Sequence, residues 1–149
     1  MIFKEITSYQ AIKEIYQDKQ SWYLLFECID NSKEVIEKDG EISFDKSYDK
    51  LYYINEKEYF WIGGYDDDKL CFLQFVQKPK WNHLELVVAQ KKENIKAKNW
   101  FNGVVEYVKF LYPKLKSITT LPINDKLKDY YKTFGFNDYK HGEIKLTIN

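Results

Sequence analysis

Residues 124–136, near the end of the chain, place an amide and a phenol at helical spacing. The amide of Asn124 can cap a helix or face a ligand. The phenol of Tyr131 is protonated at neutral pH and lies one helical turn after Leu127, on the same face. Gly135 fits the left-handed residue that ends a helix. The pattern predicts a short helix with polar groups available for a ligand. It also fits a capped amphipathic helix whose tyrosine is part of the core.

A carboxylate interrupts an apolar stretch earlier in the chain. Glu85 stands between Leu84 and Leu86, and alternate residues of a strand point to opposite faces. If the two leucines face one side, the Glu85 carboxylate points to the other. That side is either a cleft or solvent.

A lysine-rich segment follows this stretch. Lys91, Lys92, Lys96 and Lys98 all lie within it, and the chain contains no arginine. A phosphate or carboxylate would therefore be held by lysine point charges or backbone N–H groups, without a bidentate fork. The alternative is a solvated loop beside the start of a helix.

Helices and strands must position these side chains. The sequence predicts these elements less clearly in the first third of the chain than in the rest. Thr7 and Gln10 have the spacing of a capping box at the start of a helix. In order, the pattern predicts a helix, a buried strand, a short helix and a stretch that allows either strand or helix, over residues 8–20, 22–29, 31–40 and 41–58.

The remainder of the chain is clearer. We expect three strands joined by short turns at residues 66–68 and 78–80, then a long helix, a strand, a short helix and a strand. These span residues 58–65, 69–77, 81–89, 98–112, 117–121, 125–133 and 143–148. The third strand, the long helix and the next strand form a βαβ crossover, which places two parallel strands in the middle of a mixed sheet.

This order of elements, together with residues 124–136, resembles the GNAT acetyltransferase superfamily. GNAT proteins often carry an Asn, an apolar residue three later, a Tyr seven later and a closing Gly-Phe, here Asn124, Leu127, Tyr131 and Gly135–Phe136. The resemblance covers nearly the whole chain. It implies one α+β domain over residues 1–149, with a mixed, mostly antiparallel central sheet flanked by helices and a splayed central parallel strand pair. Acetyl-CoA would enter the gap as cosubstrate, and its pyrophosphate would meet the amino terminus of the long helix.

The resemblance also implies roles for individual residues. Asn124 would contact the pantetheine arm, to which Val87 and Val88 would offer backbone groups. Tyr131 would be the general acid that protonates the departing CoA thiolate, which suits a protonated phenol. Glu85 would be the general base that deprotonates the incoming ammonium, directly or through a water.

The expected pyrophosphate loop departs from the GNAT pattern. That pattern is Arg or Gln, two residues, Gly, one residue, then Gly or Ala. The best register puts Lys92 at the basic position, Ile95 at the first glycine and Ala97 at the last. A β-branched residue such as Ile95 resists positive φ and crowds a phosphate. Charge from Lys96 and Lys98 would partly compensate.

The composition of the chain limits which cellular compartment and which binding partners we expect. The 23 basic and 23 acidic residues cancel, so we expect no nucleic-acid partner. Cys28 and Cys71 lie in apolar, strand-like runs and are expected to be small core residues. No signal peptide, membrane span or metal-ligand spacing is visible, so a soluble, cytoplasmic protein without a metal site is expected. Exposed aromatic strands would be consistent with a homodimer.

Two functions are compatible with these observations. The first is an N-acyltransferase that passes an acetyl group from acetyl-CoA to a primary amine within a ternary complex. The second is a GNAT-fold binding or interaction module that has lost catalysis, which Ile95 and the missing glycines favour. The acceptor cannot be deduced from the sequence. Four aromatic residues either line its cleft or belong to the core, namely Trp22, Trp61, Tyr52 and Tyr53.

Overall fold

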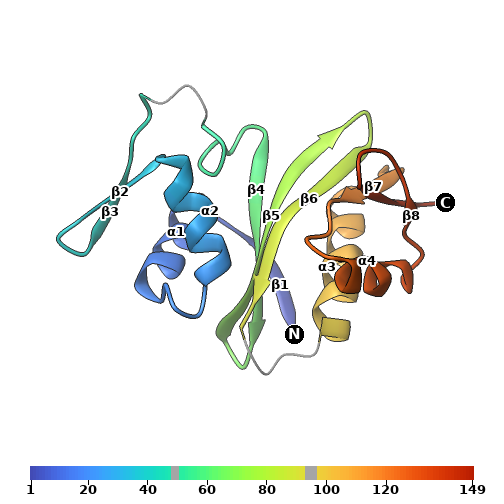
Figure 1. Cartoon of the computed structure of the whole chain (residues 1–149), viewed down its shortest axis with the longest axis horizontal. Helices are drawn as coiled ribbons and strands as arrows, with labels where there is room; N and C mark the ends of the chain where they lie inside the picture. Colours follow the sequence, from blue (N-terminus) through green and yellow to red (C-terminus); the bar gives the residue numbers. More distant parts are fainter. Residues whose placement is uncertain (48–50, 93–96) are drawn as a thin grey trace.

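A mixed β-sheet runs through the middle of the molecule, with two helices against each of its faces (Figure 1). The computed structural model describes the backbone of residues 1–47, 51–92 and 97–149, and the side chains of these residues except 97–99. In chain order the elements are β1 (Ile2–Ile6), α1 (Ser8–Gln17), α2 (Tyr23–Ser32), β2 (Val35–Lys38), β3 (Glu41–Phe44), β4 (Tyr59–Asp66), β5 (Lys69–Lys80), β6 (His83–Lys91), α3 (Ala97–Leu111), β7 (Ser117–Thr120), α4 (Asp125–Lys132), β8 (Asn137–Asp138) and β9 (Ile144–Thr147).

The main sheet has the strand order β1-β4-β5-β6-β7-β9-β8. All neighbouring strands are antiparallel except β6 and β7, which are parallel and are connected through α3. The predicted α+β class and the predicted βαβ crossover are therefore confirmed. Helices α1 and α2 pack on one face of the sheet, and α3 and α4 pack on the other.

The first helix begins as the sequence predicts. The Thr7 hydroxyl accepts a hydrogen bond from the Gln10 N–H at 3.1 Å, and the Gln10 side chain accepts one from the Thr7 N–H at 2.9 Å. This capping box satisfies two donors that the start of a helix leaves open. The helix ends at Gln17.

The strand predicted over residues 22–29 is wrong, because this run forms α2. Leu25 and Ile29 are fully buried, whereas Tyr23 and Glu27 are exposed. The buried side chains are four residues apart, which is the spacing of one helix face. The run is apolar on several sides, so its helical period is hard to see in the sequence alone.

The short helix predicted over residues 31–40 is also wrong. Strands β2 and β3 form an antiparallel hairpin there. Asp39 and Gly40 at its tip have φ values of 55° and 80°. Positive φ at both turn residues is typical of the two-residue hairpin turns that Asp-Gly favours.

Two further differences between prediction and structure concern strand β1 and the turn after β5. Strand β1 was not expected, because only Ile6 of this edge strand is buried and the run shows no alternation. The turn expected at residues 78–80 lies later, at Trp81 and Asn82, whose φ values are 57° and 64°. Pro79 lies inside β5, where the pairing with β6 shifts register, so its missing N–H breaks no regular ladder.

The core consists of two apolar clusters, one on each face of the sheet. Along β5, Phe72 and Val76 belong to the cluster under α3 and α4, and Leu73 and Phe75 belong to the one under α1 and α2. Burial on both faces explains why this strand is almost continuously apolar. Among the described residues, no helix is long and apolar enough to cross a membrane.

The expected environments of the cysteines and tryptophans can be compared with this core. Cys71 is buried in β5, as expected, whereas Cys28 is half-buried and lies on α2 instead of a strand. Trp22 and Trp61 are fully buried in the cluster under α1 and α2. Of the two interpretations left open for these tryptophans, the structure supports the plain core.

Helix α3 lies very close to β1 at Gly103, which generates a testable prediction. A Cβ added to Gly103 would lie 2.0 Å from Cε2 and 2.5 Å from Cζ of Phe3. Helix propensity favours Ala over Gly by about 1 kcal/mol, but forcing atoms into a packed core costs about 1–3 kcal/mol. We expect Gly103→Ala to lower the free energy of unfolding by up to about 2 kcal/mol, measured by urea denaturation.

The Phe3→Leu background is the control, because leucine lacks the ring atoms that cause the clash. In that background we expect Gly103→Ala to be neutral or stabilising. An equal loss of stability in both backgrounds would show that the Phe3 contact is not the cause.

Candidate functional site

Strands β6 and β7 pair only over their first residues and then separate. The pairing runs from His83 with Ser117 to Leu86 with Thr120, after which β7 ends and β6 continues to Lys91. The Thr120 hydroxyl donates a hydrogen bond to the Leu86 carbonyl at 2.9 Å and closes the ladder. Beyond this point, the edge of β6 faces a gap instead of a strand. The predicted splayed parallel pair is therefore present.

A β-bulge bends β6 at the same place. Val76 of β5 pairs with Leu86, and Phe75 pairs with Val88, so Val87 is an extra residue on β6. Val87 and Val88 both pack on the α1–α2 side of the sheet, whereas Leu86 packs on the other side. The bulge thus changes which side chains face each helix layer just where the two strands part.

The side chain of Gln74 supplies hydrogen bonds at the bulge. Its amide nitrogen donates to the Phe75 carbonyl at 2.9 Å and to the Val88 carbonyl at 3.1 Å. Gln74 is only 3% exposed, so these bonds compensate for burying a polar group. A side chain therefore supplies the hydrogen-bond partner for two backbone carbonyls at the bulge.

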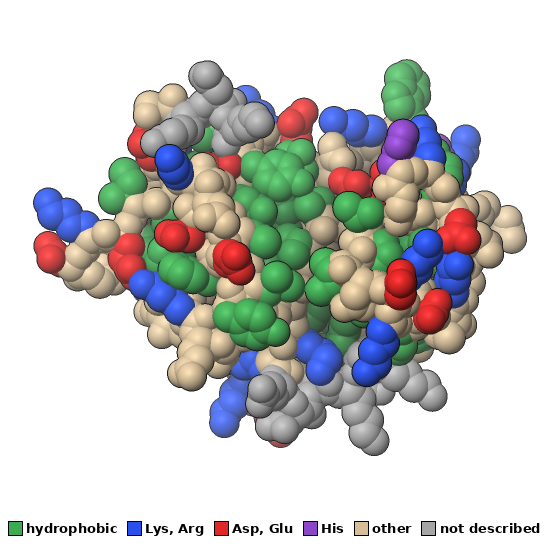
Figure 2. Space-filling view, viewed as in Figure 1, with side chains coloured by type: hydrophobic (Ala, Val, Ile, Leu, Met, Phe, Trp, Pro, Cys, Tyr) green, Lys and Arg blue, Asp and Glu red, His purple; other side chains and the backbone are tan. Residues whose placement is uncertain are grey.

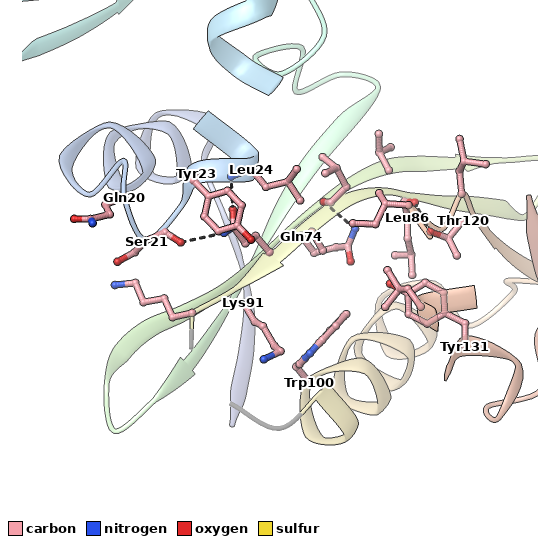
Figure 3. A pocket seen from close by; sticks show the side chains of 18 residues that line it. Gln20, Ser21, Tyr23, Leu24, Gln74, Leu86, Lys91, Trp100, Thr120 and Tyr131 are labelled. Atoms are coloured by element: carbon pink, nitrogen blue, oxygen red, sulfur yellow. Dashed lines mark hydrogen bonds between the residues drawn. The ribbon is translucent and has the colours of Figure 1, made fainter. Parts of the chain in front are cut away.

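A cavity of about 750 Å³ occupies the gap between β6 and β7. Figure 3 shows that its lining comes from both helix layers: Tyr23 and Leu24 lie on one side, and Trp100 and Tyr131 lie on the other. Apolar side chains gather down the middle of this face of the molecule, between the two helical halves (Figure 2). Among the described residues, eighteen line the cavity: Gln20, Ser21, Tyr23, Leu24, Gln74, Leu86, Val87, Val88, Ala89, Gln90, Lys91, Lys92, Trp100, Thr120, Leu121, Ile123, Leu127 and Tyr131.

The rim of this cavity is apolar and exposed. Tyr23 is 67% exposed on α2, and Leu121 and Ile123 are 55% and 69% exposed after β7. Exposed apolar side chains that gather at one opening mark binding surfaces. The cavity can therefore accept an extended ligand with apolar segments and a few polar groups.

Gln90 joins the first wall of the cavity to β6. Its side-chain oxygen accepts hydrogen bonds from the N–H groups of Leu24 at 3.0 Å and Leu25 at 3.2 Å. Its side-chain nitrogen donates to the Ser21 carbonyl at 3.0 Å. The N-cap residue of α2, Trp22, makes no side-chain cap, so Gln90 caps this helix from across the cavity wall.

Tyr131 projects from α4 into the second wall. Its ring stacks on Phe101, with centroids 4.5 Å apart, and the residue is only 7% exposed. Burial raises the pKa of the Tyr131 hydroxyl well above its ordinary value of 10.0. The phenol therefore keeps its proton at neutral pH and remains a proton donor.

Asn124 caps α4, as the sequence allowed. Its side-chain oxygen accepts a hydrogen bond from the Leu127 N–H at 2.8 Å. Gly135 has a φ of 98°, which confirms the predicted left-handed residue after the helix. Asn124 is not part of the cavity lining, so its expected contact with a ligand stays a prediction.

Glu85 lies on the α1–α2 side of β6, opposite to Leu84 and Leu86, as predicted. It is not part of the cavity lining and stands two residues before the bulge. Burial, with a smaller contribution from Glu143, raises the pKa of the Glu85 carboxyl above its ordinary value of 4.5. Its charge in turn helps to raise the pKa of Tyr52 to about 12, behind the larger effects of burial and of Tyr59.

Tyr52 and Tyr53 are fixed near this carboxylate by a second one. The buried Glu34 accepts hydrogen bonds from the N–H groups of both tyrosines. Tyr53 is 9% exposed and belongs to the core, whereas Tyr52 is half-buried and packs edge-on against Tyr59. Of the four aromatic residues considered for an acceptor cleft, Tyr52 is therefore the one best placed beside Glu85.

Lys92 binds carboxylates of the protein itself. Its ammonium lies 3.5 Å from a Glu14 oxygen and 3.7 Å from an Asp18 oxygen, and 5.3 Å from the centroid of the Trp22 ring. These contacts tie the end of β6 to α1. Ile95 and Lys96 lie outside the described residues.

The other residues of the expected pyrophosphate loop begin α3. Ala97 is the first residue of that helix and Lys98 the second, and only their backbone is described. The start of a long helix therefore follows the end of β6, which is the arrangement that the sequence predicts.

Several cavity residues were missed by the sequence interpretation, among them Gln74, Gln90 and Trp100. Gln74 interrupts an apolar strand run and Gln90 ends one, which is the one signal that could have drawn attention to them. Trp100 has no such signal, because it lies at helical spacing within the apolar face of α3.

Comparison with known proteins gives matches in structure alone. No family model matches the sequence, and no curated protein matches it. The PaiA N-acetyltransferase of Thermoplasma acidophilum in complex with coenzyme A matches with a TM-score of 0.57 and 14% identity, over 99% of this chain and 100% of that chain. Tetrahymena GCN5 matches with a TM-score of 0.51 and 12% identity, over 62% and 70% of the two chains.

The present chain has the GNAT fold. The resemblance read from residues 124–136 is confirmed at this level. The structure of the AtaT–AtaR complex bound to DNA also matches, with a TM-score of 0.50 and 12% identity over 62% of this chain and 69% of that chain. The DNA belongs to that complex, and the expected absence of a nucleic-acid partner for the present chain stays a prediction.

The raised pKa of Glu85 generates a prediction about stability. A carboxyl group with a raised pKa in the folded state binds its proton more tightly there than in the unfolded chain. The contribution of Glu85 to wild-type stability therefore falls as the pH rises from 4.5 through that raised pKa. Glu85→Gln has no proton to lose, so we expect it to be more stable than wild type near neutral pH. Urea unfolding over a pH series measures this gain, which should shrink at acidic pH. A gain that did not change with pH would contradict the assignment.

Proposed function

We propose that this chain is an acyl-CoA-dependent N-acyltransferase that passes an acetyl group from acetyl-CoA to a primary amine. The observation that carries the proposal is the cavity at the splayed edge of β6, with the Tyr131 phenol in its wall. The GNAT fold, shared with an N-acetyltransferase solved in complex with coenzyme A, supports it. Both substrates bind together, and proximity supplies much of the rate.

The cofactor lies along the free edge of β6. Its pantetheine arm pairs with the backbone at Val87 and Val88 and packs against the apolar rim. The arm also reaches Asn124 at the start of α4. The Val88 carbonyl already accepts a hydrogen bond from Gln74, so the pairing depends on Val87 and on other polar groups in the wall.

The pyrophosphate is placed at the start of α3, where the helix dipole favours negative charge. Backbone N–H groups at the start of α3 hold it together with the lysines of this part of the sequence, Lys92, Lys96 and Lys98. Phosphate binding requires Lys92 to leave Glu14 and Asp18 or to be shared with them. Exposed and half-exposed ion pairs of this kind contribute about 1 kcal/mol or less, so a phosphate can compete for the ammonium.

The reaction moves one proton at each end of the acyl group. The acceptor ammonium gives a proton to Glu85, directly or through a water, and the free amine attacks the thioester carbonyl carbon. A C–N bond forms, the C–S bond breaks, and the departing thiolate takes the Tyr131 proton. The raised pKa of Glu85 makes its carboxylate a stronger base, and the raised pKa of Tyr131 keeps its proton in place until the thiolate forms.

A second candidate function is a GNAT-fold module that binds a ligand or partner without catalysis. The specific observation in its favour is that Lys92, the expected basic phosphate ligand, is bound by Glu14 and Asp18. Ile95 in place of a glycine favours it as well. Binding of CoA without turnover of any amine would support this module.

The first prediction of the proposed function is that wild-type protein binds acetyl-CoA. Isothermal titration should give a dissociation constant in the micromolar to millimolar range that is usual for enzyme substrates. Ala89→Phe should abolish binding, because Ala89 lines the cavity and the added ring fills it. Circular dichroism shows whether this variant keeps the fold. No binding to wild type at millimolar acetyl-CoA would refute the proposal.

The second prediction separates catalysis from binding. Tyr131→Phe removes the phenol but keeps the ring against Phe101, so we expect unchanged acetyl-CoA affinity and a fall in kcat of about 10²-fold. Release of the CoA thiol is measured with amino acids, aliphatic diamines and lysine-bearing peptides as acceptors.

Tyr130→Phe is the matched control, because the Tyr130 hydroxyl is buried without a hydrogen-bond partner among the described residues. It should leave kcat nearly unchanged, and equal effects of the two variants would remove Tyr131 from the mechanism. Glu85→Gln, assayed in parallel, should lower kcat/KM near neutral pH because an amide cannot accept the proton. An unchanged kcat/KM would exclude Glu85 as the base.

A further inference from the structure

Lys91 and Lys92 are neighbours in the sequence, but their side chains lie on opposite faces of the sheet. Gln90 pairs with Leu73 and Lys91 pairs with Phe72 across β5 and β6, and paired residues have their side chains on the same face. Leu73 belongs to the cluster under α1 and α2, and Phe72 belongs to the one under α3 and α4. Lys91 therefore lies on the α3–α4 side. Lys92 follows it and, like Gln90, lies on the α1–α2 side.

On the α1–α2 side, the Lys92 ammonium is already bound. It lies 3.5 Å from a Glu14 oxygen, 3.7 Å from an Asp18 oxygen and 5.3 Å from the centroid of the Trp22 ring. The Glu14 carboxylate also accepts a hydrogen bond from the Trp22 indole N–H at 3.2 Å. The backbone N–H of Lys92 donates to the Cys71 carbonyl at 2.8 Å. Lys92 thus belongs to a network that fixes the turn between α1 and α2, next to the first wall of the cavity.

On the α3–α4 side, Lys91 lies near the start of α3. Its partner Phe72 stacks on Trp100, with ring centroids 4.7 Å apart, and Trp100 belongs to the first turn of α3. Lys91 and Trp100 both line the cavity, and Figure 3 shows Lys91 extending from β6 on the side on which Trp100 lies. Lys91 is half-buried, and no carboxylate in the described part of the chain forms an ion pair with it.

This end of the cavity is positively charged. Of the lining residues that the structure describes, only Lys91 and Lys92 are charged, and none is acidic. The first turn of α3 contains no acidic residue either, and the amino terminus of a helix favours an anion. An ammonium binds a phosphate as a point charge. Lys91 can therefore bind a phosphate near the start of α3 without giving up an ion pair.

We propose that the two lysines have separate tasks: Lys91 binds the pyrophosphate of the cofactor, and Lys92 stays on α1 and positions the opposite wall. The inference rests on the proposed function and refines it, because Lys91 takes the place of Lys92 among the phosphate ligands. Lys92 would first have to leave Glu14 and Asp18, whereas Lys91 needs no such exchange. Lys92 is then a positioning residue that acts through the α1–α2 turn. Its ion pairs are thereby compatible with an enzyme that binds CoA.

Lys91→Met tests the first task, because methionine keeps an unbranched side chain and removes the charge. ADP serves as a ligand with a pyrophosphate and no pantetheine arm. We expect the dissociation constants of ADP and CoA to rise by about three- to tenfold, as for the loss of one half-buried charged contact. That of pantetheine should not change. Isothermal titration at physiological ionic strength measures these values. Equal ADP affinities of wild type and variant would overturn the assignment.

Lys91→Arg keeps the charge and should restore the affinity for ADP to nearly that of wild type. A loss as large as that of Lys91→Met would show that the charge of Lys91 is not the cause, and the assignment would fail.

Lys92→Met is the matched control, since it makes the same change one residue later. Its dissociation constant for ADP should stay within about twofold of wild type, because solvent and salt screen a charge that does not contact the phosphate. We expect a lower urea midpoint and a rise of about two- to fivefold in the dissociation constant of pantetheine, whose wall is less well ordered. If the variant weakened ADP binding as much as Lys91→Met, Lys92 would be a phosphate ligand and the division of tasks would be refuted. Lower stability with unchanged pantetheine affinity would refute the positioning role.

Binding of CoA itself separates this inference from the proposed function. If CoA binds equally well to wild type and to Lys91→Met, the role of Lys91 is refuted and the proposed function stands. If neither CoA nor ADP binds to wild type at millimolar concentration, both are refuted.

Discussion

The whole arrangement depends on how β6 satisfies its backbone after it loses a parallel partner at Leu86. Buried N–H and C=O groups must find partners, and a splayed strand with a bulge loses the regular ones. Side chains replace the ladder: Thr120 bonds the last paired carbonyl, and Gln74 bonds two carbonyls at the bulge. Gln90 bonds the first turn of α2. Polar side chains thus supply hydrogen bonds around the cavity, where β7 no longer pairs with β6.

The gap matters chemically because the two proposed catalytic groups lie on opposite sides of the sheet. Glu85 belongs to the face under α1 and α2, and Tyr131 belongs to the face under α3 and α4. A closed sheet would keep a base and an acid in these places apart. Where β6 and β7 separate, an acyl group in the gap can be approached by an amine from the first side and release its thiolate toward the second. The proposed reaction thus uses both faces of one sheet.

Local patterns predicted the second half of the chain well. The cap at Asn124, the helix face with Leu127 and Tyr131, and the left-handed Gly135 all depend on residues a few positions apart, and all are confirmed. The strand predicted over residues 22–29 was wrong for a related reason. Its helix begins without a cap of its own, because the capping atoms come from Gln90, more than sixty residues later. Because the capping residue lies so far away in the chain, the residues next to the helix do not show where it begins.

The residues of the candidate site could likewise be predicted only in part from the sequence. Residue types nominated Tyr131 and Glu85, and the structure puts Tyr131 in the cavity wall and Glu85 just outside it. Gln74 escaped notice because its importance lies in the carbonyls of Phe75 and Val88, to which its amide nitrogen donates across two strands. In the sequence, Trp100 looks like one more apolar residue of α3, and only its place in the fold puts it in the cavity wall. Buried polar groups need partners, but the residues that supply them lie far apart in the chain. A residue type can therefore nominate a side chain for chemistry, whereas the hydrogen bonds that shape the cavity wall follow only from the folded structure.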